Sequence, residues 1–113
     1  MTNIDPKEVT AYSIFVYGSE IGAGSMREMI YLYGPNNNEL LAIVKFHDPG
    51  MTFFLDAVNN NVIFMNLPSE MFNNILDILR NEKPVYVRFN ETSGGNYGTI
   101  TTSFEQVGEG ETI

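Results

Sequence analysis

LPSEMFNNILDILRN, residues 67–81, is the only stretch of the chain whose apolar residues recur at three-, four- and seven-residue spacing. This spacing gathers them on one side of a helix and leaves the polar residues on the other side. Pro68 suits a first helical turn, Asn81 suits a left-handed cap, and Pro84 prevents the helix from continuing. Because so short a helix is marginal alone in water, its apolar side predicts a sheet against which it packs.

The segments on both sides of this helix predict that sheet. Each is rich in β-branched and aromatic residues and is bounded by turn formers such as Asp48-Pro49-Gly50. We therefore predict an α+β fold with a five-stranded antiparallel meander, one amphipathic helix and a C-terminal β-hairpin. The predicted strands are residues 9–17, 25–33, 40–47, 51–58, 61–66, 85–89 and 97–104, with a two-residue turn at Asn59 and Asn60.

The predicted strands carry apolar residues in both alternation phases. In segment 25–33, Met29 and Tyr31 oppose Ile30 and Leu32, whereas a sheet with one wet face should alternate more cleanly. One short helix covers only part of one face. We therefore expect a strongly curved sheet or open barrel whose outer apolar residues are covered by a second copy of the chain.

The composition is that of one small globular domain, residues 1–113, without cysteine. No disulfide, thiolate zinc site or cysteine nucleophile is therefore possible. The formal net charge of -8 at pH 7 disfavours non-specific binding to duplex nucleic acid. The polar ends, residues 1–8 and 107–113, are predicted to be flexible. Because neither a signal peptide nor an apolar membrane span is evident, we expect a soluble, cytoplasmic protein with no membrane partner.

No residue pattern predicts catalysis, a metal site or a cofactor, and no motif identifies a family. His47 is the only histidine and stands in the turn sequence HDPG, so we interpret it as a residue that packs or hydrogen-bonds locally. Asp48 and Asp56 lie at opposite ends of one predicted strand, too far apart to share a site. The glycine-rich loops 18–24 and 93–98 connect strands and lack the lysine of a phosphate loop. We therefore expect a non-catalytic protein.

Six tyrosine, arginine and lysine side chains are predicted to point to sheet faces that the helix does not cover. Tyr and Arg are enriched in protein interfaces, which favours a subunit contact in a homo-oligomer. The same residue types stack bases and meet phosphates, so binding of single-stranded nucleic acid is the alternative, although the net charge disfavours it. A third hypothesis is an enzyme or small-ligand protein with His47 or Asp48 in a pocket. The six residues of the predicted binding face are Arg27, Tyr31, Tyr33, Lys45, Tyr86 and Arg88.

Overall fold

The computed structural model describes residues 2–21, 26–50 and 55–102. Over these residues the chain forms one α-helix, one 3₁₀ turn and eight strands, which confirms the α+β class. In chain order the elements are β1 (Asn3–Val9), β2 (Ala11–Ile21), β3 (Met26–Tyr33), β4 (Leu40–His47), β5 (Ala57–Asn59), β6 (Val62–Pro68), the 3₁₀ turn η1 (Ser69–Met71), α1 (Phe72–Asn81), β7 (Val85–Thr92) and β8 (Gly95–Thr102).

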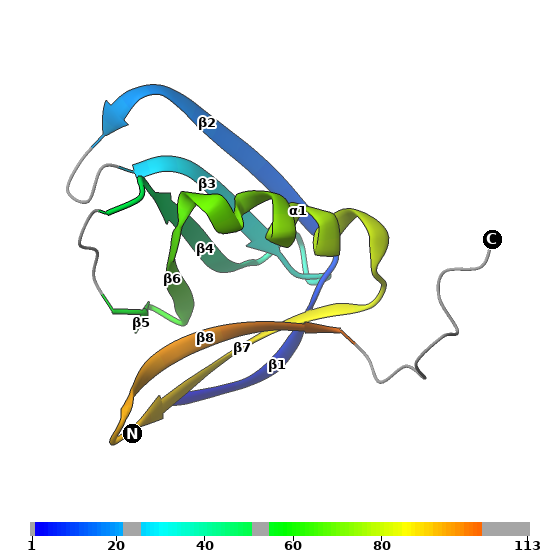
Figure 1. The fold of residues 1–113 in the computed structure, drawn as a ribbon. Coiled ribbons are helices and arrows are strands. Elements are labelled where there is room, and N and C mark those ends of the chain that lie inside the picture. The colour runs from blue at the N-terminus through cyan, green and yellow to red at the C-terminus, as the bar shows by residue number, and fades with distance from the viewer. Residues whose placement is uncertain (1, 22–25, 51–54, 103–113) are drawn as a thin grey trace, which may run out of the picture.

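The described strands form two separate sheets rather than a closed barrel. The larger sheet has the strand order β2-β3-β4-β6-β5, and the smaller sheet has the order β1-β7-β8. All neighbouring strands are antiparallel except β4 and β6, which are parallel. Figure 1 shows α1 in front of β3 and β4, with the smaller sheet below them.

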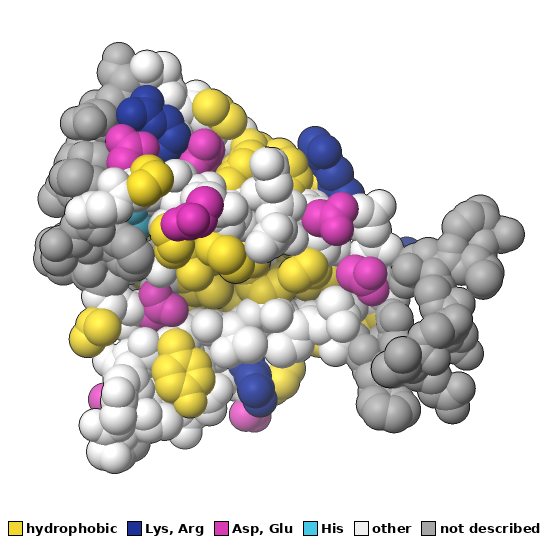
Figure 2. All heavy atoms as spheres, viewed as in Figure 1, with side chains coloured by type: hydrophobic (Ala, Val, Ile, Leu, Met, Phe, Trp, Pro, Cys, Tyr) yellow, Lys and Arg dark blue, Asp and Glu magenta, His cyan; other side chains and the backbone are white. Residues whose placement is uncertain are grey.

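The core lies between the larger sheet, the helix and the smaller sheet. Ile30 of β3, Phe46 of β4 and Phe89 of β7 are buried in one hydrophobic cluster. The Phe46 ring meets Phe72 of α1 edge to face, with 5.2 Å between ring centroids. Figure 2 shows hydrophobic side chains gathered where the helix meets the smaller sheet. Burying each side chain of this size contributes about 1.5–3 kcal/mol, so this cluster holds the two sheets together.

The predicted meander is confirmed only in part. β2, β3 and β4 follow one another as antiparallel neighbours, but β6 pairs with β4 in parallel and β5 pairs with the far side of β6. The parallel register places Ala42 beside Ile63 in the core. A central strand buried on both faces is apolar in both phases, which explains the pattern of β4. Of the predicted strand 51–58, only the end belongs to β5, and residues 51–54 lie outside the described residues.

The N-terminal segment 1–8, predicted to be flexible, instead contributes most of strand β1. Ile4 and Val9 pack against the core, and β1 pairs with β7 across the smaller sheet. Between these two apolar residues the register with β7 shifts, so the strand shows no regular alternation that the sequence could reveal. The other predicted flexible end, residues 107–113, lies outside the described residues.

The helix is shorter than predicted. β6 continues to Pro68 and a 3₁₀ turn follows, so α1 begins at Phe72. Its end at Asn81 agrees with the prediction, but Asn81 does not adopt the left-handed conformation. Instead, the Asn81 side-chain amide donates to the main-chain carbonyl oxygen of Asp77 at 3.0 Å. The buried position of Ile75 confirms the apolar side of the helix.

The turn formers lie where the sequence predicts, with one shift. Gly50 has a φ of 81°, as the turn after Asp48-Pro49 requires. In the hairpin between β5 and β6, the two residues with positive φ are Asn60 and Asn61, at 53° and 65°, rather than Asn59 and Asn60. Both central residues of a type I′ hairpin turn need positive φ, so the hairpin begins one residue later than expected.

Candidate interaction surface

The face of the larger sheet that points away from α1, called the outer face below, carries a row of apolar and aromatic side chains. Because Ile30 is buried in the core, the alternation of β3 places Tyr31 on the opposite face. Tyr31 is paired with Ile43 of β4, and Ile43 is paired with Phe64 of β6. The outer face comprises Ser13, Phe15, Met29, Tyr31, Tyr33, Ile43, Lys45 and Phe64.

Aromatic rings contact one another across the outer face. The Tyr31 ring lies between Phe15 of β2, at a centroid distance of 4.9 Å, and Tyr33, at 6.4 Å. The Tyr33 hydroxyl is within hydrogen-bond distance of the Ser13 hydroxyl, at 3.0 Å. Tilted ring pairs of this kind stabilise the surface beyond the area they bury. The three rings therefore form one preassembled patch.

The cations of the outer face and its end are already engaged. The Lys45 ammonium lies 5.3 Å from the centroid of the Phe64 ring, a cation–π distance. Arg27 donates two hydrogen bonds to the Asp48 carboxylate, at 3.2 and 3.0 Å. The hydrogen bond from Arg27 is the main cause that lowers the pKa of Asp48. Positive charge is therefore held close to the sheet.

Glu28 stands beside this ion pair without a full set of partners. Its Oε1 atom is buried and has no hydrogen-bond partner among the described residues. Burial raises the pKa of Glu28, nearby Arg27 opposes the rise, and Asp48 adds to it. A carboxylate in this position is costly while it is ionised.

The six residues of the predicted binding face do not form one surface. Tyr31, Tyr33 and Lys45 lie on the outer face, whereas Arg27 lies at the register shift between Met26 and Glu28, where the alternation of β3 is interrupted. Tyr86 and Arg88 belong to β7 in the smaller sheet, where the alternating Val85, Val87 and Phe89 are buried. The exposed phase of β7 therefore points away from the core on the other side of the molecule. The structure brings three of the six together, places Arg27 at the end of the same sheet, and separates Tyr86 and Arg88 from them.

His47 and the two aspartates have separate hydrogen-bond partners. His47 is buried at the end of β4 and not in the expected turn, and its Nε2 atom lies 2.9 Å from Oδ1 of Asn66 in the neighbouring strand β6. Asp56 accepts the main-chain N–H of Asn66 in β6 at 2.8 Å and that of Gly98 in β8 at 2.9 Å. Burial raises the pKa of Asp56, while these two hydrogen bonds oppose the rise. Asp56 therefore links the two sheets, whereas Asp48 pairs with Arg27 as described above.

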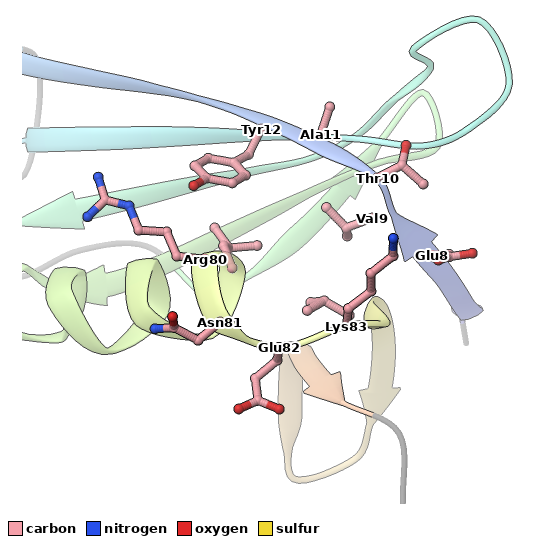
Figure 3. Close-up of a pocket in the computed structure, with 11 residues that line it drawn as sticks. Glu8, Val9, Thr10, Ala11, Tyr12, Arg80, Asn81, Glu82 and Lys83 are labelled. Atoms are coloured by element: carbon pink, nitrogen blue, oxygen red, sulfur yellow. The ribbon is translucent and has the colours of Figure 1, made fainter. Parts of the chain in front are cut away.

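A cleft of about 580 Å³ lies where β1 meets β2 and where α1 leads into β7. Figure 3 shows the Tyr12 ring pointing toward Arg80 across this cleft. Cations and carboxylates are balanced in the lining, so the cleft has no net charge that would select an ionic ligand. Neither His47 nor Asp48 lines it, so it is not the pocket of the small-ligand hypothesis. The charged lining residues are Glu8, Arg80, Glu82 and Lys83.

Sequence reasoning missed three residues that the structure brings forward. Phe15 and Val16 are neighbours in β2, and their side chains are 39% and 67% exposed. The presence of large apolar residues in both phases of the first predicted strand was the available signal. Asp56 was considered only as a catalytic or metal-binding group, although a carboxylate next to an apolar strand needs N–H donors when it is half-buried.

Comparisons with protein-family models, with curated protein sequences and with solved structures gave no match to this chain. Within residues 2–21, 26–50 and 55–102, no group of three or more His, Asp or Glu side chains is arranged to hold a metal ion. No helix among the described elements is long and apolar enough to cross a membrane. The geometry of the larger sheet is therefore the basis for a functional proposal.

Proposed function

We propose that this protein is a non-catalytic assembly domain that binds a second copy of itself through the β2 end of the larger sheet. This proposed contact surface consists of the outer face around Phe15 and Tyr31 and the edge of β2 with which no described strand pairs. The observation that carries the proposal is the exposed Phe15 beside the half-buried rings of Tyr31 and Tyr33 on the outer face, followed in β2 by the exposed Val16. Contiguous apolar surface that a chain does not cover itself typically marks an interface.

The local charge supports a second copy as the partner. The protein carries a formal charge of -8, so two copies repel each other over most of their surfaces. The proposed contact surface differs, because Lys45 contributes a positive charge to it and Arg27 neutralises Asp48 at one end of the sheet. Two copies can therefore meet here with less repulsion than elsewhere. Tyr, Phe and Met are also residue types enriched at the centre of interfaces.

Three observations favour a protein partner over single-stranded nucleic acid. Arg27 is paired with Asp48, Lys45 lies over the Phe64 ring, and Arg88 belongs to the other sheet. Nucleic-acid platforms need free cations beside stacking rings to meet phosphates. Nucleic-acid binding stays the second candidate because Tyr31 and Tyr33 are neighbouring aromatic rings on one open sheet face.

The test is the mass of the protein in solution, measured by light scattering on a sizing column over a dilution series. We expect twice the chain mass of 12.7 kDa at micromolar concentration. Tyr31→Ala should move the dissociation to higher concentration, because it removes the central ring of the patch. Tyr86→Ala is the matched control, since Tyr86 is a half-buried tyrosine on the smaller sheet. A wild-type monomer at every concentration, especially one that binds labelled single-stranded oligonucleotides, contradicts the proposal.

A further inference from the structure

The two sheets have four edge strands, and three of them are protected against pairing with another chain. β1 contains Pro6 and Lys7 and has a register shift with β7. β5 has only three residues. Short edges, proline, lysine and bulges are the devices by which natural sheets block edge pairing. These two edges are therefore poor templates for a further strand.

The β8 edge is protected by the larger sheet. The main-chain N–H of Gly98 is already bonded to Asp56. A Cβ atom built on Gly98 would lie 2.6 Å from Cγ of Met65 in β6, which shows how closely the two elements approach. No further strand can pair with β8 at this point without breaking the contact between the sheets.

From Ala11 to Val16, where β2 pairs with β3 without interruption, it has none of these protections, and its register shift lies beyond Val16. It is 11 residues long, contains no proline, and has no charged residue from Ala11 to Ser19. Its paired neighbour in the described structure is β3 on one side, and no described strand pairs with its other side. A long, uncharged edge with open main-chain N–H and C=O groups is a template for another strand.

The exposure of Phe15 and Val16 distinguishes an edge contact from a face contact. Consecutive residues of a strand point to opposite faces. Phe15 points to the outer face, where it meets Tyr31, and Val16 points to the other face. A partner lying on the outer face would cover Phe15 and leave Val16 in water. A strand placed alongside β2 would cover the flanks of both.

We propose that β2 pairs antiparallel with β2 of a second copy, so that the two larger sheets become one continuous sheet. This inference rests on the proposed self-association and specifies its geometry. A twofold axis perpendicular to the sheet keeps both outer faces on one side and lets the same main-chain groups bond reciprocally. Residues directly opposite must share a face. The axis therefore passes through a residue and not between two, and we place it at Phe15 or Val16 because these are the exposed apolar residues of β2.

The first experiment places a charge on the edge. Val16→Lys puts two ammonium groups close together at the twofold axis, so the dimer should dissociate at concentrations at which the wild type stays paired. Because Val16 is 67% exposed and is paired with Glu28, the monomer tolerates a lysine there. Leu55→Lys is the control, since Leu55 is 73% exposed and lies outside the strands. Circular dichroism of each variant confirms the fold.

The second experiment uses the absence of cysteine, which makes any introduced cysteine the sole thiol. Phe15→Cys and Val16→Cys are oxidised separately, and one of them should form a disulfide-linked dimer in high yield, since Cβ atoms of directly opposite residues are close enough. Lys45→Cys tests the alternative geometry, in which the outer faces of two copies pack on each other. It lies within the outer face, so it should cross-link only when two outer faces pack on each other.

The outcomes separate the inference from the proposed function. A wild-type monomer overturns both. A dimer that survives Val16→Lys and cross-links at Lys45→Cys overturns the edge pairing and keeps the self-association. Failure of both Phe15→Cys and Val16→Cys to cross-link also overturns the edge pairing, even if Val16→Lys does not fold. Dissociation by Val16→Lys together with a cross-link at residue 15 or 16 supports it.

Discussion

Removing the Asp56 carboxylate should loosen the contact between the two sheets. Asp56 accepts two main-chain N–H groups, one from each sheet, at 2.8 and 2.9 Å. Removing the acceptor leaves two main-chain N–H groups without a partner, at a cost of about 1–3 kcal/mol each, and relief of the buried charge offsets part of this. We therefore expect Asp56→Ala to lower the free energy of unfolding by about 2–4 kcal/mol. For a chain of this size that is a fall in Tm of about 8–16 °C.

The pH dependence of stability distinguishes hydrogen bonding by the Asp56 carboxyl group from simple packing of its side chain. The pKa of Asp56 is raised above 3.8 in the folded protein, so the folded state binds a proton more tightly than the unfolded state. Its contribution is fully present below pH 3.8 and is lost as the pH rises through the folded pKa. In urea titrations, the stability of the wild type relative to Asp56→Asn should therefore grow as the pH falls from 7 toward 4. An Asp56→Ala variant within 0.5 kcal/mol of the wild type, on the order of an ordinary surface substitution, would refute this reasoning.

Two other substitutions test the packing and the electrostatics. Gly98→Ala should lower the free energy of unfolding by about 1–3 kcal/mol, because the new methyl group overlaps Met65, and Gly18→Ala, with no atom within 4 Å of its Cβ, should not. Glu28→Gln should raise the midpoint of urea unfolding at pH 7, because the raised pKa of Glu28 means that its ionised form opposes folding. This gain should disappear below pH 4.5, the ordinary pKa of the group, and a gain that persists in acid would show that another cause operates.

The features that the sequence predicts correctly are local. The amphipathic side of α1 follows from spacing within one segment, and Ile75 is buried as expected. The hairpin of β7 and β8 follows from two alternating segments separated by glycines, and both strands pair as predicted. Alternation within β3 also places Tyr31 and Tyr33 on the same face. In each case the determining residues lie in one segment or in two segments that follow each other along the chain.

The features that it misses depend on which strands become neighbours. The parallel pairing of β4 with β6 has no local signal, because apolar residues in both phases fit a central strand of either direction. β1 forms because Ile4 and Val9 pack against the core, in a sheet whose other strands lie far along the chain. The residues of the predicted binding face were separated for the same reason, because the sequence does not show which strands become neighbours. Whether Arg88 lies beside Tyr31 depended on the sheet that β7 joins, and β7 joins the smaller one.

The position of β6 beside β4 puts the contact between the two sheets and the proposed dimer edge at opposite ends of the larger sheet. Because β6 takes the inner position, the short strand β5 forms one end, where Asp56 ties β6 to Gly98 of β8. The long strand β2 forms the other end, where no described strand pairs with its outer edge. Asp56→Ala should therefore lower the unfolding midpoint without changing the concentration at which the dimer dissociates at temperatures far below unfolding. Val16→Lys should raise the concentration at which the dimer dissociates without changing the unfolding midpoint of the monomer. If the two variants changed both quantities together, the two ends of the sheet would not be independent, since distant sites without shared partners should act additively.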